Sequence, residues 1–407
     1  MSPRLLPVSA ALLLSACAAA PPAPPPPGDE TVPLLTVGLD LRTPALRARE
    51  AVERVRGRPV PDEAAVPVVA TRAEMVDAFC EELRPQVDML YPGAPPQARE
   101  TVLRSTAQRS ARGVVARYSP ERRRILLPTE NLLPQMAALG LPTDRAAVRD
   151  FLVLVLAHEM VHAVDDAEHG LATLFRSVPD AEALRALGMV VEGRAVHYAR
   201  RAAADLGLPG EVSSILPAEK GPLDDYRARF LLTYREGAAF AAALEARGGG
   251  LSDRVLADPP RLTSTVFHPE RYGPGGEAAV PDLAAALRGA GFAGAAAASE
   301  LDLRAHWLPV LGEEGTSRAF AGFLAGAGLH RPDGGVSLSI HETPEAAAAY
   351  AAGLRRIYGM EEGAAEGATQ GLAAVVLVEA HRVASAVGPD TAAARGESER
   401  ALVAEGR

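Results

Sequence analysis

The chain contains very few cysteines and lysines, and each shortage excludes a class of protein. Cys17 and Cys80 are the only cysteines, and Cys17 lies in a leader-like N-terminus. A mature body that contains Cys80 alone cannot form an internal disulfide, which excludes a disulfide-stapled scaffold. Lys220 is the only lysine, so nearly all positive charge is arginine. With a net charge of −9 the chain lacks the basic excess that nucleic acid binding normally requires, and we expect no nucleic acid partner.

Long hydrophobic runs are also lacking. The first residues, MSPRLLPVSAALLLSAC, place Arg4 before a short apolar stretch that ends in small residues. This pattern is typical of a secretory signal and is too short for a transmembrane helix. Its end, Leu14-Ser15-Ala16-Cys17, resembles the bacterial lipobox, in which the cysteine is lipidated and becomes the new N-terminus. The alternative is an ordinary signal peptide with a chance cysteine.

A proline-rich segment, AAAPPAPPPPGDE, follows Cys17 and predicts an extended tether. We therefore expect a signal peptide at 1–16, a lipidated Cys17 with its tether at 17–30, and a folded body from residue 31 onward. This organisation predicts a protein of the bacterial cell envelope that is attached to a membrane through lipid, with the outer membrane as one candidate. The oligomeric state does not follow from the sequence.

The body has a globular composition, with 48% hydrophobic and 23% charged residues. Thr71 and Glu74 form a capping-box pattern, and Thr143-Asp144 can cap a long helix that Gly170 ends. The segment VVARYSPERRRILLP predicts a hairpin. The run AAVVLVEAHRVASAV is strand-like. We expect an α+β fold that is mostly helical, with a main domain at 31–275, an α/β region at 276–387 and a flexible tail at 388–407. Helices are expected at 44–56, 71–90, 96–112, 143–169, 180–205, 222–246, 282–289, 317–326 and 343–357.

The most informative stretch is LVLVLAHEMVHAVDD, residues 152–166 of an otherwise apolar helix. Positions i and i+4 share one helix face, so His158 and His162 can point their imidazoles at one ion. Glu159 lies about 100° around the helix, where it can reach a water on that ion. Imidazole suits zinc, which lowers the pKa of its bound water so that a carboxylate can take the proton. The pattern predicts a zinc site with Glu159 as the proton acceptor.

Such a site needs a third protein ligand. Glu192 is favoured because the helix at 180–205 can return alongside the first as a helical hairpin. Gly193 beside it permits close approach of the two helices. The other candidates are His169, His197, Asp166 and Glu236.

With these motifs in place, the chain resembles gluzincin-type metallopeptidases, and more narrowly an uncharacterised family of prokaryotic secreted proteins and lipoproteins. That family pairs a motif like H-E-L-T-H-A-L-Q-D with a later L-V-E-G-D-A, a Y-x-x-G-x-x-F segment and an H-P-E-K-Y segment. The matching segments here are HEMVHAVDD at 158–166, VEGRA at 191–195, YREGAAF at 234–240 and HPERY at 268–272. The similarity covers roughly residues 70–275. It implies a zincin-like core with a small β-sheet, the active-site helix and a second helix that carries the glutamate ligand.

Three departures from the family affect the predicted site. Arg194 stands where the family tends to have an acid, and Ser264 and Thr265 replace the polar pair expected before His268. Val196 stands where thermolysin-like enzymes place the aspartate that orients a ligand histidine. Asp166 is the nearest substitute for that aspartate, or else a solvated carboxylate at a helix end.

The sequence thus predicts a membrane-anchored zinc metallopeptidase that hydrolyses peptide bonds of a peptide or protein substrate in the cell envelope. Glu159 would move the proton, and His268 would donate a hydrogen bond to the oxyanion of the reacting carbonyl. Tyr234 and Tyr272 are the alternative donors. The rival hypothesis is a non-catalytic envelope lipoprotein that binds zinc for structure and acts as a scaffold or assembly factor.

Overall fold

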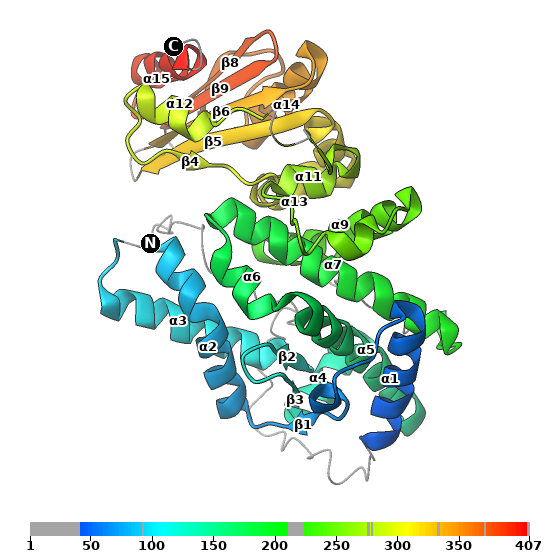
Figure 1. The fold of residues 1–407 in the computed structure, drawn as a ribbon. Helices are drawn as coiled ribbons and strands as arrows, with labels where there is room; N and C mark the ends of the chain where they lie inside the picture. The colour runs from blue at the N-terminus through cyan, green and yellow to red at the C-terminus, as the bar shows by residue number, and fades with distance from the viewer. Residues whose placement is uncertain are drawn as a thin grey trace. The chain divides into compact units, whose positions relative to one another are not determined.

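The protein has an α+β fold that is mostly helical, as the sequence predicts (Figure 1). The computed structural model describes residues 41–91, 93–210, 224–274, 277, 280–331, 334–369 and 372–404. The predicted signal peptide, Cys17 and the tether lie outside these residues. Contacts divide the chain into two compact units, here called the N-terminal and the C-terminal unit. The N-terminal unit comprises the described residues up to 210 and Phe230–Arg261; the C-terminal unit comprises 224–229 and the described residues from Leu262 onward.

The N-terminal unit consists mainly of helices. Thr71 and Glu74 form the predicted capping box: the Thr71 hydroxyl accepts from the Glu74 N–H, and the Glu74 carboxylate accepts from the Thr71 N–H. Of the described helices, none is both long and apolar enough to cross a membrane. The helices of this unit are α1 (Arg42–Arg56), η2 (Asp62–Ala64), α2 (Arg72–Leu90), α3 (Pro96–Gly113), α4 (Thr129–Ala138), α5 (Arg145–His169), α6 (Leu171–Ser177), α7 (Ala181–Asp205), most of α9 (Asp225–Arg247) and α10 (Leu251–Arg254).

A small three-stranded sheet lies beside these helices. The predicted hairpin is confirmed, because β2 (Arg117–Ser119) pairs antiparallel with β3 (Arg124–Leu127). Strand β1 (Val68–Val69) pairs parallel with β3 on its other side, so the order is β1-β3-β2 and β2 is an edge strand. Strand β2 also packs against α5, which places it next to the helix that carries the predicted ligands.

Helix α5 is the centre of the main core. Its N-cap is Asp144, whose carboxylate accepts from two backbone N–H groups, and it ends at Gly170 with φ of 66°. A left-handed φ is accessible to glycine without a steric penalty, so the helix stops where the sequence predicts. Between these ends α5 is buried on all sides against α1, α7 and the sheet. A helix that is apolar all around is expected at such a central position.

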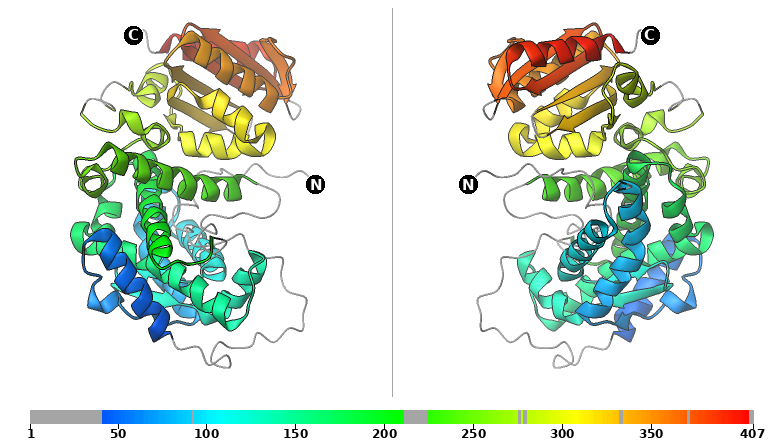
Figure 2. Two further views of the ribbon diagram at one scale, coloured as in Figure 1. Left: turned by 90° about the vertical axis from the view of Figure 1, so that its right-hand side faces the viewer. Right: turned by 90° about the vertical axis from the view of Figure 1, so that its left-hand side faces the viewer.

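The C-terminal unit is built on a six-stranded antiparallel sheet of order β4-β5-β6-β9-β8-β7. Alternation along β8 sends Val375 to the core under α15, while Ala374 and Val376 join the core under α14. Figure 2 shows α14 (orange) and α15 (red) on opposite faces of this sheet. The elements of this unit are α11 (Thr263–Phe267), η3 (Pro269–Arg271), α12 (Leu283–Gly289), β4 (Ala296–Ala297), α13 (Glu300–Phe320), β5 (Phe323–Arg331), β6 (Gly334–His341), α14 (Pro344–Ile357), β7 (Glu366–Thr369), β8 (Leu372–Glu379), β9 (Arg382–Gly388) and α15 (Thr391–Leu402).

Three expectations for the C-terminal region need correction. The flexible tail at 388–407 is wrong for its described part, because α15 buries Ala394 and Ala401 against the sheet. The helix expected at 317–326 is also wrong in its second half, since α13 ends at Phe320 and β5 begins at Phe323, where pairing with β6 outweighs local preference. Contacts divide the units between Arg261 and Leu262, earlier than the boundary expected at 275.

Candidate metal centre

Helix α5 places the two histidines side by side. His158 and His162 are 2% and 4% exposed, and their ring centroids are 4.7 Å apart. Their Nε2 atoms lie 3.1 Å from each other. Both side chains leave the same face of the helix one turn apart, as the i, i+4 spacing predicts.

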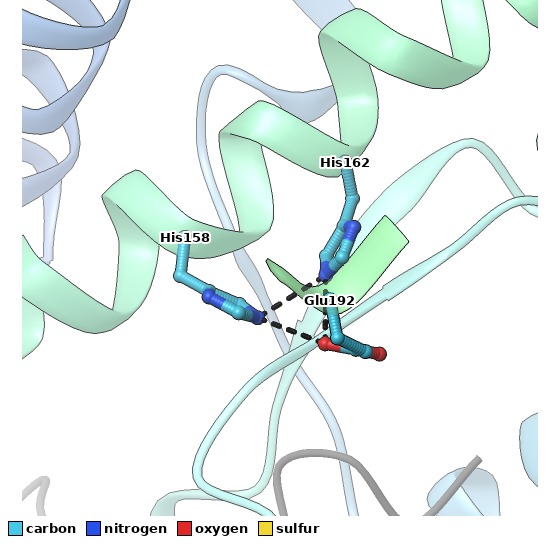
Figure 3. A group of neighbouring side chains, drawn as sticks. All are labelled: His158, His162 and Glu192. Carbon is cyan, nitrogen blue, oxygen red and sulfur yellow. Dashed lines mark hydrogen bonds and ion pairs between the residues drawn. The ribbon is translucent and has the colours of Figure 1, made fainter. Parts of the chain in front are cut away.

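Helix α7 brings Glu192 to the same point. Helices α5 and α7 pack against each other, with the short α6 between them in the chain. Glu192 Oε2 lies 3.3 Å from Nε2 of His158 and 3.4 Å from Nε2 of His162 (Figure 3). In the part of the chain that the structure describes, His158, His162 and Glu192 form the group of side chains that could hold a metal ion.

The triangle of ligand atoms fits a small divalent ion. An ion bound tetrahedrally at about 2.0–2.1 Å requires its ligand atoms to be about 3.3–3.4 Å apart. The observed separations are 3.1, 3.3 and 3.4 Å. Two nitrogens and one carboxylate oxygen also form the mixed donor set that transition metals accept. The cluster therefore supplies three corners of a tetrahedron and leaves a fourth corner for another ligand.

Glu159 is oriented by the edge strand of the small sheet. It is completely buried, and its Oε2 accepts a hydrogen bond of 2.6 Å from the backbone N–H of Tyr118 in β2. That bond holds one carboxylate oxygen of Glu159 at the edge strand without using a side chain. The carboxylate is also close enough to His162 to interact with it electrostatically. The general-base role of Glu159 stays a prediction.

Asp166 does not have the partner expected for it. The sequence leaves Asp166 either as the residue that orients a ligand histidine or as a helix-end carboxylate, and the structure shows its carboxylate accepting from the Tyr118 hydroxyl at 2.8 Å and from the Leu171 N–H at 2.7 Å. The Nδ1 atoms of His158 and His162 are buried and have no hydrogen-bond partner among the described residues. The reason is positional: Asp166 lies at the start of the turn into α6, where the N–H of Leu171 needs an acceptor.

Tyr234 does lie at the site. Its side chain is 1% exposed, and its ring stacks on that of His158 with centroids 6.0 Å apart and an angle of 21° between the planes. The Phe230 ring also packs on Tyr234, with ring centroids 4.7 Å apart. Tyr234, which the sequence predicts beside the metal ligands as well as an alternative oxyanion donor, thus contacts His158 and limits its rotation.

Two charged residues at the site escaped the sequence analysis. Arg117 of β2 is buried, and its Nη1 lies 3.5 Å from Glu192 Oε1 while its Nη2 donates to the buried Glu82 of α2. Burial by itself would raise the pKa of Glu192, but the neighbouring histidines and Arg117 outweigh burial and hold the pKa well below its usual range. Glu192 is therefore an ionised carboxylate, the form that binds cations. The sequence feature that could have indicated Arg117 is the presence of an arginine within an otherwise apolar strand pattern.

A buried ion pair joins the two ligand helices. Asp165 is completely buried, and its carboxylate accepts from Arg194 at 2.8 and 3.1 Å and from Arg56 at 3.0 Å. Arg194 was the departure from the family motif, where an acid is usual. In this chain the acidic partner of the ion pair is Asp165 on α5. The pairing of Asp165 with Arg194 holds α7 against α5 close to the ligands His162 and Glu192.

The other ligand candidates lie outside the cluster. His197 pairs with Glu245 at 2.8 Å, and Glu236 accepts from its neighbour Arg235. His169 is the last residue of α5. His268 belongs to the C-terminal unit, where its Nε2 lies 3.5 Å from Oε1 of the buried Glu300, and its predicted role stays untested.

No protein-family model matches this chain, and no curated protein and no solved structure is similar enough to it to count as a match.

Proposed function

We propose that this protein is a zinc-dependent metallopeptidase of the bacterial cell envelope, held at a membrane by lipid on Cys17. The observation that carries the proposal is the convergence of three buried ligand side chains, rather than four, among the described residues, with the buried Glu159 on the same helix as the two histidines. A structural zinc site is usually closed by four protein ligands, whereas a catalytic site keeps a position for water or substrate.

The chemistry divides among few residues. Zinc bound by His158, His162 and Glu192 would lower the pKa of a water in the open position. Glu159 would take up the proton of that water and would pass it to the leaving amine. The hydrogen bond from the Tyr118 N–H would restrict the movement of the Glu159 carboxylate during these steps.

The charge of the site supports this assignment. Two neutral imidazoles and one carboxylate leave a divalent ion with a net positive charge, which an electron-rich carbonyl oxygen can partly neutralise. The peptide bond is the substrate proposed because of the motif resemblance around the two ligand helices. The rival function, a scaffold with a structural zinc, does not need a carboxylate fixed beside the open corner.

The test combines metal analysis with a digest of a peptide library by the purified mature chain. We expect about one zinc per chain and cleavage that Glu159→Gln abolishes, while the zinc content of that variant stays unchanged. The Gln side chain can still accept the Tyr118 hydrogen bond, so the fold around it is preserved. Zinc without cleavage in the wild type would favour the scaffold, and a fully active Gln variant would eliminate the proton-transfer role.

A further inference from the structure

We propose that Arg117 is a positioning residue of the metal centre, which makes Glu192 bind the ion through one carboxylate oxygen instead of two. The inference rests on metal binding by the cluster, which is part of the proposed function, but it does not require hydrolysis. Arg117 would act through Glu192, since its Nη1 lies 3.5 Å from Oε1 of that carboxylate.

The two oxygens of Glu192 have different neighbours. Oε2 lies 3.3 and 3.4 Å from the two histidine Nε2 atoms, whereas Oε1 lies 3.5 Å from Nη1 of Arg117. A guanidinium on Oε1 competes with the ion for that oxygen, since both are cations seeking the same lone pairs. The carboxylate is thereby restricted to a single metal bond, and the corner that a second oxygen would occupy stays open.

The guanidinium of Arg117 is itself fixed from two further sides. Its Nη2 donates to the buried carboxylate of Glu82, and its Cζ lies 5.7 Å from the centroid of the Phe79 ring. Both neighbours come from α2, and the side chains of Arg117 and Glu82 are only 7% and 6% exposed. A flexible arginine in solvent would form only a weak ion pair with Glu192. A buried guanidinium that also donates to Glu82 keeps a fixed position relative to Glu192.

Strand β2 thus serves the site through two consecutive residues. The side chain of Arg117 orients a ligand, and the backbone N–H of Tyr118 orients Glu159. Neighbouring residues of a strand have fixed relative directions, so a single rigid segment sets both carboxylates with respect to the histidines. Partners that orient metal ligands in this way typically change metal affinity or activity about 10–100-fold when they are mutated.

The test uses the purified mature chain with Zn²⁺ and Co²⁺ as probes. Arg117→Met is expected to weaken Zn²⁺ binding about 10–100-fold in a chelator competition. It is also expected to lower the visible absorption of the Co²⁺ form, because cobalt(II) absorbs less strongly when a second carboxylate oxygen raises its coordination number. A role in folding alone would not change that spectrum.

A matched control is available next to the site. Arg122 pairs with Glu81 at 2.8 and 2.9 Å, which is an arginine–glutamate pair one residue along α2 from Glu82 but more exposed. Arg122→Met should leave both the affinity and the spectrum unchanged. Arg117→Lys keeps the charge beside Glu82 but lacks the planar fork that fixes both carboxylates in one geometry. It decides the question if Arg117→Met does not fold, and it should shift the spectrum in the same direction.

The outcomes separate the two proposals. Wild-type Zn²⁺ affinity and an unchanged Co²⁺ spectrum in a folded Arg117 variant would overturn this inference and leave the proposed function standing. Altered metal binding in a chain that hydrolyses nothing would support the inference and reject the enzyme. A wild-type chain that takes up neither ion would overturn both.

Discussion

Gly193 of α7 and Gly237 of α9 meet backbone to backbone: a Cβ on Gly193 would lie 2.0 Å from the carbonyl carbon of Gly237. The sequence predicts that Gly193 permits close approach of α7 to α5, whereas the close neighbour of Gly193 in the structure is Gly237 of α9. The contact lies beside Glu192 and one turn from Tyr234, which stacks on His158. Two short motifs far apart in the chain are thus joined at the metal centre.

Gly193→Ala should destabilise the protein and loosen the site. No side-chain rotation can relieve a clash with backbone, so α7 and α9 must separate, at a cost of about 3 kcal/mol, the upper range for overpacking. The free energy of unfolding measured with denaturant should decrease, and the affinity for zinc should fall as well. Gly396→Ala is the control, because a Cβ there meets nothing within 4 Å, and it should not reduce stability.

Glu192→Ala should lose most of the metal affinity, because it removes one of three ligand atoms. Glu236→Ala is the matched control: this glutamate lies on α9 close to Gly237, but it pairs with Arg235 and is outside the cluster. Chelator competition with Zn²⁺ measures both variants. A stronger loss in Glu236→Ala than in Glu192→Ala would reassign the third ligand.

Acid should weaken the contact between α5 and α7. Burial by itself would raise the pKa of Asp165, but Arg194 and Arg56 outweigh burial and lower the pKa below its usual range. A lowered pKa stabilises the fold above the unfolded-state pKa of about 3.9, and this stabilisation is lost as the pH falls from there through the folded-state pKa. Chemical unfolding of the wild type should therefore become easier in that range.

The matching variant for this prediction is Asp165→Asn. It leaves the buried Arg194 and Arg56 without their anion, and we expect a loss of about 3–5 kcal/mol at neutral pH. Because Asn does not titrate, the dependence of stability on pH below about 3.9 should be shallower than in the wild type. Parallel curves for the two proteins would show that Asp165 does not contribute to the acid sensitivity.

His268→Ala should leave zinc content unchanged and reduce turnover about 10²–10³-fold, the usual effect of losing one oxyanion donor. His306→Ala is the control, since this histidine of the same unit is 57% exposed and pairs with Asp225. Steady-state cleavage of a library-derived peptide is the measurement. Equal turnover in the wild type and His268→Ala would remove His268 from the mechanism, and Tyr234 would be the next residue to substitute.

Cys17 should carry lipid, because lipobox-like residues precede it and a proline-rich tether follows. Labelled fatty acid should enter the wild type and Cys80→Ala, but not Cys17→Ala. Release of the wild type as a soluble protein would contradict the anchor.

The sequence by itself determined the elements with strong local signals. Asp144 and Gly170 set the ends of α5, Thr71 and Glu74 set the start of α2, and the hairpin of β2 and β3 followed from a turn between two apolar runs. The pair of histidines was also predictable, because ligands four residues apart on one helix need no tertiary contact to converge. Glu192 could be favoured over its rivals from a helical hairpin, although only the packing of α7 on α5 brings its carboxylate to the histidines.

The tertiary structure alone decided which charges meet. Arg117 reaches the site from β2 and Glu82 from α2, and no sequence pattern predicts that these two elements meet there. The carboxylate of Asp166 accepts from Tyr118 and Leu171 rather than from His162. Residues expected to form a flexible tail form helix α15 instead, because the apolar face of this helix is buried only when it packs against the assembled sheet. Local patterns specify backbone geometry within a few residues, whereas the partner of a buried charge depends on which distant element packs beside it.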